Sequence, residues 1–135
     1  MASSYTELPA SAVLTCYLVE DSAIIRENLI ATLEEMVMVR VIGYAETEQS
    51  AVEWIEGPAP DCKLMIIDIF LAFGSGLEVI RCAHRLRPAT KLVVLTNYAT
   101  AEIRQRCLQL GADKVFDKSA ELEDLLAYCG GLATA

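Results

Sequence analysis

The chain has 135 residues, of which 54% are hydrophobic and 22% are charged. This length suits one globular domain with a substantial core, and the high apolar content excludes a disordered chain. The formal net charge of −8 argues against nucleic acid or an anionic membrane as a partner, because surfaces that bind them carry clustered Lys and Arg.

The sequence contains five cysteines, an odd number, and no C-x-x-C motif. With His84 as the single histidine, these cysteines do not suggest a zinc site, and we expect reduced thiols. The apolar run 12–19 is too short to span a bilayer, and no Lys or Arg precedes it as in a signal peptide. We therefore expect a cytoplasmic protein.

The first half of the chain predicts two strands, each followed by a helix. The run 13–19 has strand length, and Ser22 can cap a helix behind it. The apolar stripe of that helix consists of Ile25, Leu29, Leu33 and Met36. The run 39–45 is rich in β-branched residues, and Thr47 can cap a helix through Glu56.

The second half continues the same alternation. Its expected elements, in chain order, are strand 63–67, a helix that ends before Pro88, strand 91–95, a helix from Thr100 to Gly111, strand 114–116 and a helix capped by Ser119. The run 63–67 is apolar after its first residue, which indicates a strand that is buried on both faces.

Five alternating β-α units predict an α/β fold with a parallel sheet covered by helices on both sides. We expect residues 1–11 to be a flexible N-terminal segment, residues 12–130 to be the domain and residues 131–135 to be a C-terminal tail. This division leaves no room for a second domain.

Polar residues follow four of the expected strands, at the carboxyl ends where open parallel sheets bind ligands. They are Glu20, Asp21, Asp68, Thr96 and Lys118. Crowded carboxylates favour a divalent cation such as Mg²⁺, and one carboxylate can become an aspartyl phosphate. A lysine and a threonine can stabilise phosphoryl oxygens.

This ordered set resembles the signature of bacterial two-component response-regulator receiver domains. The residues next to this set fit the family as well. They are Val19-Glu20-Asp21-Ser22, Ile66-Ile67-Asp68 with Gly76 eight residues after Asp68, and Phe116-Asp117-Lys118-Ser119. The resemblance covers about residues 13–129. It implies a flavodoxin-like (βα)5 sandwich with strand order 2-1-3-4-5, and a stand-alone receiver similar to the chemotaxis regulators.

The resemblance also implies roles for these residues. Asp68 would accept the phosphoryl group, Lys118 would pair with it, and Thr96 would move to bond it. Glu20, Asp21, Asp68 and the backbone carbonyl of Phe70 would hold Mg²⁺, for which Mn²⁺ could substitute, with Glu20 acting through water.

The sequence departs from the family pattern at several positions around the site. Ala72 replaces the usual proline four residues after the acceptor, and Asn97 replaces a small residue after Thr96. Val115 occupies the usual aromatic position three residues before Lys118, so the family's coupled threonine–aromatic movement lacks its aromatic partner at this position. The neighbouring Phe116 should point to the other side of its strand.

Two aromatic residues, Phe70 and Tyr98, stand two positions after Asp68 and Thr96. In the family, these positions flank the path of an attacking water. We therefore predict that Phe70 and Tyr98 slow spontaneous dephosphorylation; the alternative is that they only line a contact surface.

The implied partners are a sensor histidine kinase or histidine phosphotransfer protein near the first helix, and an unknown downstream protein. The output surface would include Arg104, Gln105, Lys114 and Glu121. We expect no nucleic-acid or membrane partner, a monomer or weak homodimer, and no enzymatic activity beyond slow autodephosphorylation. Two alternatives stay open: a pseudo-receiver that binds proteins without phosphorylation, and a small flavodoxin-like or phosphatase-type enzyme.

Overall fold

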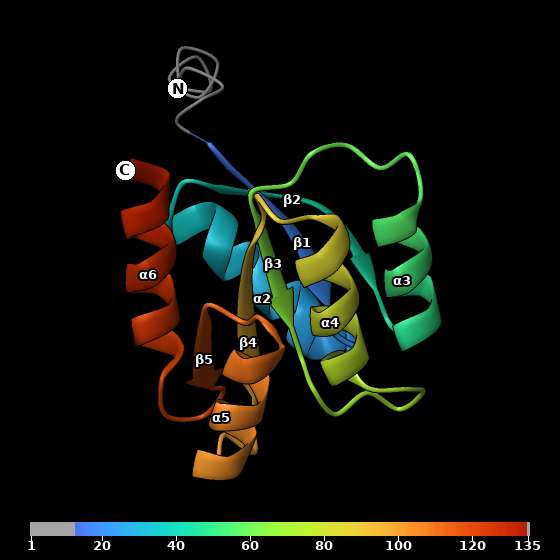
Figure 1. The fold of residues 1–135 in the computed structure, drawn as a ribbon. Coiled ribbons are helices and arrows are strands. Elements are labelled where there is room, and N and C mark those ends of the chain that lie inside the picture. Colours follow the sequence, from blue (N-terminus) through green and yellow to red (C-terminus); the bar gives the residue numbers. More distant parts are fainter. Residues whose placement is uncertain (1–12, 135) are drawn as a thin grey trace.

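The structure is a computed structural model that describes residues 13–134. Five parallel strands form one sheet in the order β2-β1-β3-β4-β5, with helices on both faces (Figure 1). The strands are β1 (Leu14–Val19), β2 (Val39–Ala45), β3 (Leu64–Ile67), β4 (Lys91–Thr96) and β5 (Lys114–Asp117). The helices are α2 (Ala23–Met36), α3 (Glu48–Glu56), α4 (Gly76–Leu86), α5 (Ala101–Leu110) and α6 (Leu122–Thr134). The predicted flavodoxin-like fold is confirmed, whereas the expected segment 1–11 lies outside the described residues.

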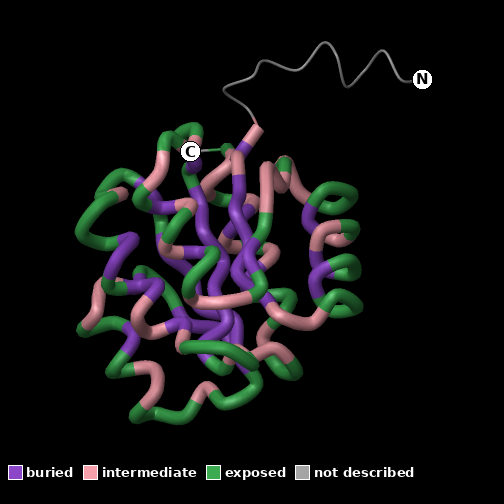
Figure 2. The backbone as a smooth tube through the Cα atoms, turned by 90° about the vertical axis from the view of Figure 1, so that its right-hand side faces the viewer, coloured by how far each residue is buried: buried purple, intermediate pink, exposed green. Residues whose placement is uncertain are grey.

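Two apolar layers hold the sheet, because successive side chains of a strand point to opposite faces. Residues of α3, α4 and α5 pack on one face, and residues of α2 and α6 pack on the other. All four residues of β3 are buried, as the sequence predicted for the central strand. Figure 2 shows the strands as a buried centre surrounded by helices with exposed outer turns.

Four of the helices have a serine or threonine at the N-cap, the residue directly before the first helical turn. Ser22, Thr47 and Thr100 cap α2, α3 and α5 by accepting backbone N–H groups, as predicted. Ser75 caps α4 in the same way. Gly111 ends α5 with a φ of 119°, a left-handed conformation that glycine adopts without steric cost.

The start of α6 differs from the prediction that Ser119 caps it. The Asp117 carboxylate accepts hydrogen bonds from the hydroxyl and backbone N–H of Ser119 and from the N–H of Ala120. This turn uses the Ser119 hydroxyl as a donor, and the helix starts only at Leu122. The helix also continues to Thr134, so residues 131–134 are helical and not a tail.

The buried face of α2 also differs from the expected stripe. Leu29 and Leu33 are buried as predicted, but Ile25 and Met36 are 36% and 70% exposed. Arg26 is buried instead, because its guanidinium donates to the Glu20 carbonyl at 3.0 Å. A charged residue therefore occupies a core-facing position beside the acidic end of β1.

The remaining sequence expectations concern thiols and membranes. The five cysteines lie within the described residues, all buried and unpaired. No helix in residues 13–134 is long and apolar enough to cross a membrane.

Candidate functional site

The five predicted site residues meet at the carboxyl edge of the sheet. Glu20 and Asp21 follow β1, Asp68 follows β3, Thr96 ends β4 and Lys118 follows β5. Since β1, β3, β4 and β5 are consecutive neighbours in the sheet, their ends form one continuous rim. Residues more than 90 positions apart in the sequence therefore line a single cleft of about 190 Å³.

Three carboxylates form the acidic side of this cleft. One oxygen each from Glu20, Asp21 and Asp68 can be chosen so that all three lie within 4.8 Å of one another. Glu20 and Asp68 are only 4% and 7% exposed, so water screens their repulsion poorly. Positive charge nearby therefore stabilises the ionised form of this cluster.

Lys118 supplies one positive charge to the cluster. Its Nζ donates hydrogen bonds to Glu20 Oε1 at 2.6 Å and to Asp68 Oδ2 at 2.8 Å. The Lys118 side chain is 11% exposed, so water screens both ion pairs less than it screens pairs at the surface. Burial lowers the pKa of Lys118, but the hydrogen bonds to Asp68 and Glu20 outweigh it and raise the pKa above its usual value.

Glu20 has the opposite balance. Burial raises the pKa of Glu20, and the hydrogen bonds from Lys118 and from the Ser22 backbone only partly offset this shift. The Ser22 N–H donates to Glu20 Oε2 at 3.0 Å. Both oxygens of Glu20 therefore already have a donor within the protein.

Backbone N–H groups also orient the two aspartates. The Phe70 N–H donates to Asp68 Oδ1 at 3.2 Å, and the Ala72 N–H donates to Asp21 Oδ2 at 2.6 Å. The second bond is possible because residue 72 is not proline, which has no N–H. Backbone N–H groups of the loop after β3 thus fix the orientation of two of the three carboxylates.

The donor set fits a divalent cation with hard oxygen ligands. Carboxylate oxygens and a backbone carbonyl are the ligands that Mg²⁺ takes in proteins, usually together with several waters. The three clustered carboxylates carry more negative charge than Lys118 alone neutralises. Asp21 and Asp68 are the residues that would bind the ion directly. Glu20 differs from them because both of its carboxylate oxygens already accept hydrogen bonds within the protein.

Thr96 and Asn97 also line the cleft, at the end of β4, which is the neighbour of β3 in the sheet. Thr96 is fully buried, and its hydroxyl accepts the Tyr98 N–H at 3.4 Å. The Lys118 N–H donates to the Thr96 carbonyl at 2.9 Å, which fixes the two residues side by side. Asn97 is exposed and lines the cleft as well.

Phe70 and Tyr98 line the same cleft from two different loops. Their rings meet edge to face, with centroids 5.1 Å apart and an angle of 77° between their planes. This contact is a favoured aromatic arrangement, yet Phe70 and Tyr98 remain 48% and 62% exposed. The pair stands at the mouth of the cleft.

Val115 does not join the cleft. It packs in the layer of α3, α4 and α5, whereas Phe116 packs in the layer of α2 and α6 beside Tyr128. The prediction that Phe116 points away from Val115 is confirmed.

Arg26 is a residue near the site that the sequence analysis missed. It bonds the Glu20 carbonyl, lies 3.4 Å from the Glu46 carboxylate and covers the Tyr44 ring at 3.9 Å. The spacing of Arg26 from Leu29 and Leu33 is that of one helix face, and this spacing could have indicated its burial.

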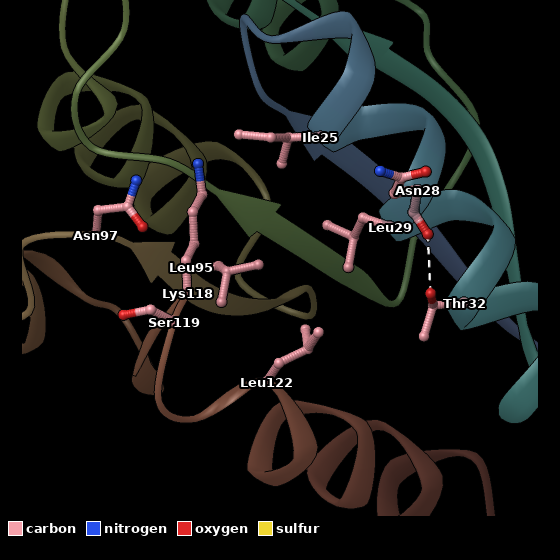
Figure 3. Close-up of a pocket in the computed structure, with 9 residues that line it drawn as sticks. All are labelled: Ile25, Asn28, Leu29, Thr32, Leu95, Asn97, Lys118, Ser119 and Leu122. Carbon is pink, nitrogen blue, oxygen red and sulfur yellow. Dashed lines mark hydrogen bonds between the residues drawn. The ribbon is translucent and has the colours of Figure 1, made fainter.

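A second cavity opens beside the cleft, between α2, α6 and the loops after β4 and β5 (Figure 3). It has a volume of about 350 Å³ and shares Ile25, Asn97 and Lys118 with the acidic cleft. Leu29, Leu95 and Leu122 give it an apolar lining. We call it the α2–α6 groove.

Residues 16–129 match the family described as the response regulator receiver domain. The chain therefore belongs to this family and is a bacterial two-component receiver. It is 26% identical over 115 residues to the response regulator UvrY of Escherichia coli O6:H1, which covers 85% of this chain and 52% of UvrY. It is 31% identical over 81 residues to the photosynthetic apparatus regulatory protein RegA of Rhodobacter capsulatus, covering 60% of this chain and 43% of RegA. The chain thus spans about half the length of these relatives.

Solved structures share the fold. A LuxR-family two-component response regulator from Aurantimonas sp. SI85-9A1 has a TM-score of 0.79 at 20% identity, covering 90% of this chain and 86% of its own. The BeF3-activated DrrB receiver domain has a TM-score of 0.76 at 23% identity, covering 91% and 99%. A response regulator from Burkholderia pseudomallei has a TM-score of 0.73 at 25% identity, covering 90% and 69%, and contains a phosphorylated aspartic acid and a calcium ion.

Proposed function

We propose that Asp68 accepts a phosphoryl group from a histidine of a partner protein, in a reaction that requires a divalent cation. The observation that carries this proposal is the position of Lys118 Nζ, 2.8 Å from Asp68 and 2.6 Å from Glu20 in a cleft with three carboxylates. This arrangement places a positive charge where phosphoryl oxygens would bind.

The transfer is a substitution at phosphorus. A carboxylate oxygen of Asp68 forms the new bond to phosphorus, and the bond between phosphorus and the histidine nitrogen breaks. The electron pair of that bond returns to the imidazole. Lys118 is placed to exchange its bond to Asp68 for one to a phosphoryl oxygen, since its Nζ is within reach of the cleft.

Asp21, Asp68 and the Phe70 carbonyl are the groups we propose as direct ligands of Mg²⁺ or Mn²⁺, with Glu20 acting through water. A bound cation would supply charge stabilisation to the phosphoryl oxygens. The Phe70 N–H bonds Asp68, so the Phe70 backbone already lies against the cluster. The Burkholderia pseudomallei protein contains both a phosphorylated aspartic acid and a calcium ion, which supports a proposal that combines an aspartyl phosphate with a hard cation.

Thr96 is proposed as the residue that bonds the phosphoryl group and reports its presence. Its hydroxyl is buried at the end of β4 and has only a long bond from the Tyr98 N–H. In that bond the Thr96 hydroxyl oxygen is the acceptor. A phosphoryl oxygen is charged and would be a strong acceptor for the proton of the same hydroxyl. The report would travel through protein contacts, with α5, β5 and α6 as the output surface.

The α2–α6 groove is the place that we propose for the phosphoryl donor protein. The groove continues into the acidic cleft through Ile25, Asn97 and Lys118, so an apolar side chain seated there would hold the donor histidine beside Asp68. Ile24, which precedes Ile25 on α2, is an exposed apolar residue as well. This continuity favours a histidine kinase or phosphotransfer protein that docks on α2.

The test is incubation of the full chain with acetyl phosphate and Mg²⁺, followed by mass spectrometry in acid. We expect a mass gain of one phosphoryl group in the wild type and in Asp124→Asn, whose carboxylate is exposed on α6. We expect none in Asp68→Asn. Equal labelling of Asp68→Asn would contradict the proposal, and no labelling of the wild type would favour a pseudo-receiver.

A further inference from the structure

Arg104 of α5 holds three acceptors with one guanidinium group. Its Nε donates to the Ala99 carbonyl at 3.0 Å, and its Nη1 donates to the Val115 carbonyl at 2.9 Å. Its Nη2 donates to Glu121 Oε1 at 2.6 Å, and the same oxygen accepts the Asp117 N–H at 2.9 Å. One side chain thus joins the loop after β4, strand β5 and the turn before α6.

Two of these acceptors lie close in the sequence to site residues. Ala99 lies three residues after Thr96, and Glu121, which also accepts the Asp117 N–H, lies three residues after Lys118. The Lys118 N–H in turn bonds the Thr96 carbonyl. A displacement of the loop after Thr96 would therefore move an acceptor of Arg104, and the guanidinium would have to follow it or release Glu121.

The side-chain chemistry explains why an arginine occupies this position. A guanidinium presents five N–H donors in a rigid fork, so it can bond three acceptors at once. Val115 is small and buried, and it bonds Arg104 through its carbonyl alone. The contact that links β5 to the loop after β4 is thus polar and does not depend on the side chain of residue 115.

We propose that Arg104 is the positioning residue that couples the loop after Thr96 to the start of α6. Binding of a phosphoryl group at Asp68 would shift the Ala99 carbonyl, and Arg104 would pass this shift to Glu121 and α6. The inference rests on the proposed phosphorylation of Asp68, but it assigns the transmission to a particular ion pair.

The test compares backbone amide spectra of the full chain with Mg²⁺ alone and with saturating Mg²⁺ and beryllofluoride, a phosphoryl mimic. The variants are Arg104→Gln and Arg104→Lys, which lose the three-way fork, and Arg106→Gln. Arg106 is an exposed arginine two residues further along α5, so its variant is matched in charge and helix. Thermal unfolding of each variant reports its stability separately.

We expect the wild type and Arg106→Gln to show signal changes near Asp68, at the Phe70 amide, and also in α6 around Leu125. In both Arg104 variants the changes near Asp68 should persist, while those in α6 should fall by roughly threefold or more. Unchanged α6 responses in the Arg104 variants, whatever their stability, would overturn the proposal, because Arg104 would then be only structural. A wild type without changes near Asp68 would overturn the proposed function, and the inference with it.

Discussion

The rings of Phe70 and Tyr98 meet edge to face at the mouth of the cleft that contains Asp68, with centroids 5.1 Å apart. Phe70 comes from the loop after β3 and Tyr98 from the loop after β4, so the contact joins the loops that follow two neighbouring strands. A water that hydrolyses an aspartyl phosphate must approach phosphorus in line with the bond that breaks. Because both rings line the cleft and are partly exposed, we expect them to obstruct that approach from the solvent.

Opening this pair should shorten the lifetime of the phosphate on Asp68. We expect Phe70→Asn combined with Tyr98→Glu to speed phosphate release by roughly tenfold, a barrier change of about 1.4 kcal/mol. Decay of the phosphoprotein, followed by mass spectrometry after removal of acetyl phosphate, measures it. Phe73→Asn is the control, since Phe73 is 74% exposed in the same loop but does not line the cleft. An unchanged rate in the double variant would mean that the two rings only form a contact surface.

The acidic cluster makes a prediction about metal affinity. Asp21→Asn removes one negative charge and one ligand while leaving the Ala72 N–H an oxygen to bond. The Kd for Mg²⁺, measured by calorimetry, should rise by about tenfold or more, which corresponds to about 1.4 kcal/mol. Asp61→Asn changes the same charge at an exposed position before the amino end of β3, away from the carboxyl edge of the sheet, and should bind Mg²⁺ as the wild type does. Equal affinities in the two variants would remove Asp21 from the ligand set.

The close approach of the Asp68 backbone explains why position 76, eight residues after the acceptor, is a glycine. A Cβ at this position would lie 2.1 Å from the Asp68 carbonyl oxygen, so no side chain fits. Gly76→Ala must push the backbone of the acceptor residue away, and we expect a loss of unfolding free energy of about 1–3 kcal/mol together with slower phosphorylation.

The control for this change is Gly131→Ala in α6. A Cβ there meets nothing within 4 Å, and alanine is the better helix former. Urea unfolding should show a stability equal to or up to about 1 kcal/mol above that of the wild type. A Gly76→Ala protein as stable as the wild type would contradict the close approach seen at Asp68.

The Arg104–Glu121 pair predicts a pH dependence of stability. The hydrogen bond from Arg104 lowers the pKa of Glu121 below its usual 4.5. Such a depressed pKa contributes stability above pH 4.5 that is lost as the pH falls through the folded value. Glu121→Gln should therefore be less stable than the wild type at pH 7, and the difference should shrink on acidification below pH 4.5. Denaturant unfolding at several pH values measures this, and a difference that stays constant would show that the charge of Glu121 plays no part.

The sequence was sufficient for the parts of the site that follow from strand ends. Asp68 and Thr96 could be placed because buried runs end at them, and the parallel topology brings such ends to one rim. The opposite directions of Val115 and Phe116 follow from the two-residue period of a strand. These features depend only on local pattern and topology.

Other features depend on loop geometry, which a local pattern does not encode. Ser119 has the side chain of an N-cap, but the carboxylate of Asp117 competes for its hydroxyl and delays the start of α6. Arg26 is polar, and the reason for its burial is a carbonyl six residues earlier in the chain. The bond between Ala72 and Asp21 joins positions 51 residues apart and could not be foreseen from either one.

The central claim is that Asp68 carries the phosphoryl group, and chemical trapping tests it most directly. An aspartyl phosphate is reduced by borohydride to homoserine in two steps: one hydride displaces phosphate from the activated carbonyl to give an aldehyde, and a second hydride reduces the aldehyde to the alcohol. Peptide mapping after phosphorylation with acetyl phosphate and Mg²⁺ should find homoserine at position 68, and none without Mg²⁺. Homoserine at Asp21 or another aspartate, or the five-carbon amino alcohol that reduction of a glutamyl phosphate at Glu20 would give, without homoserine at 68, would contradict the account.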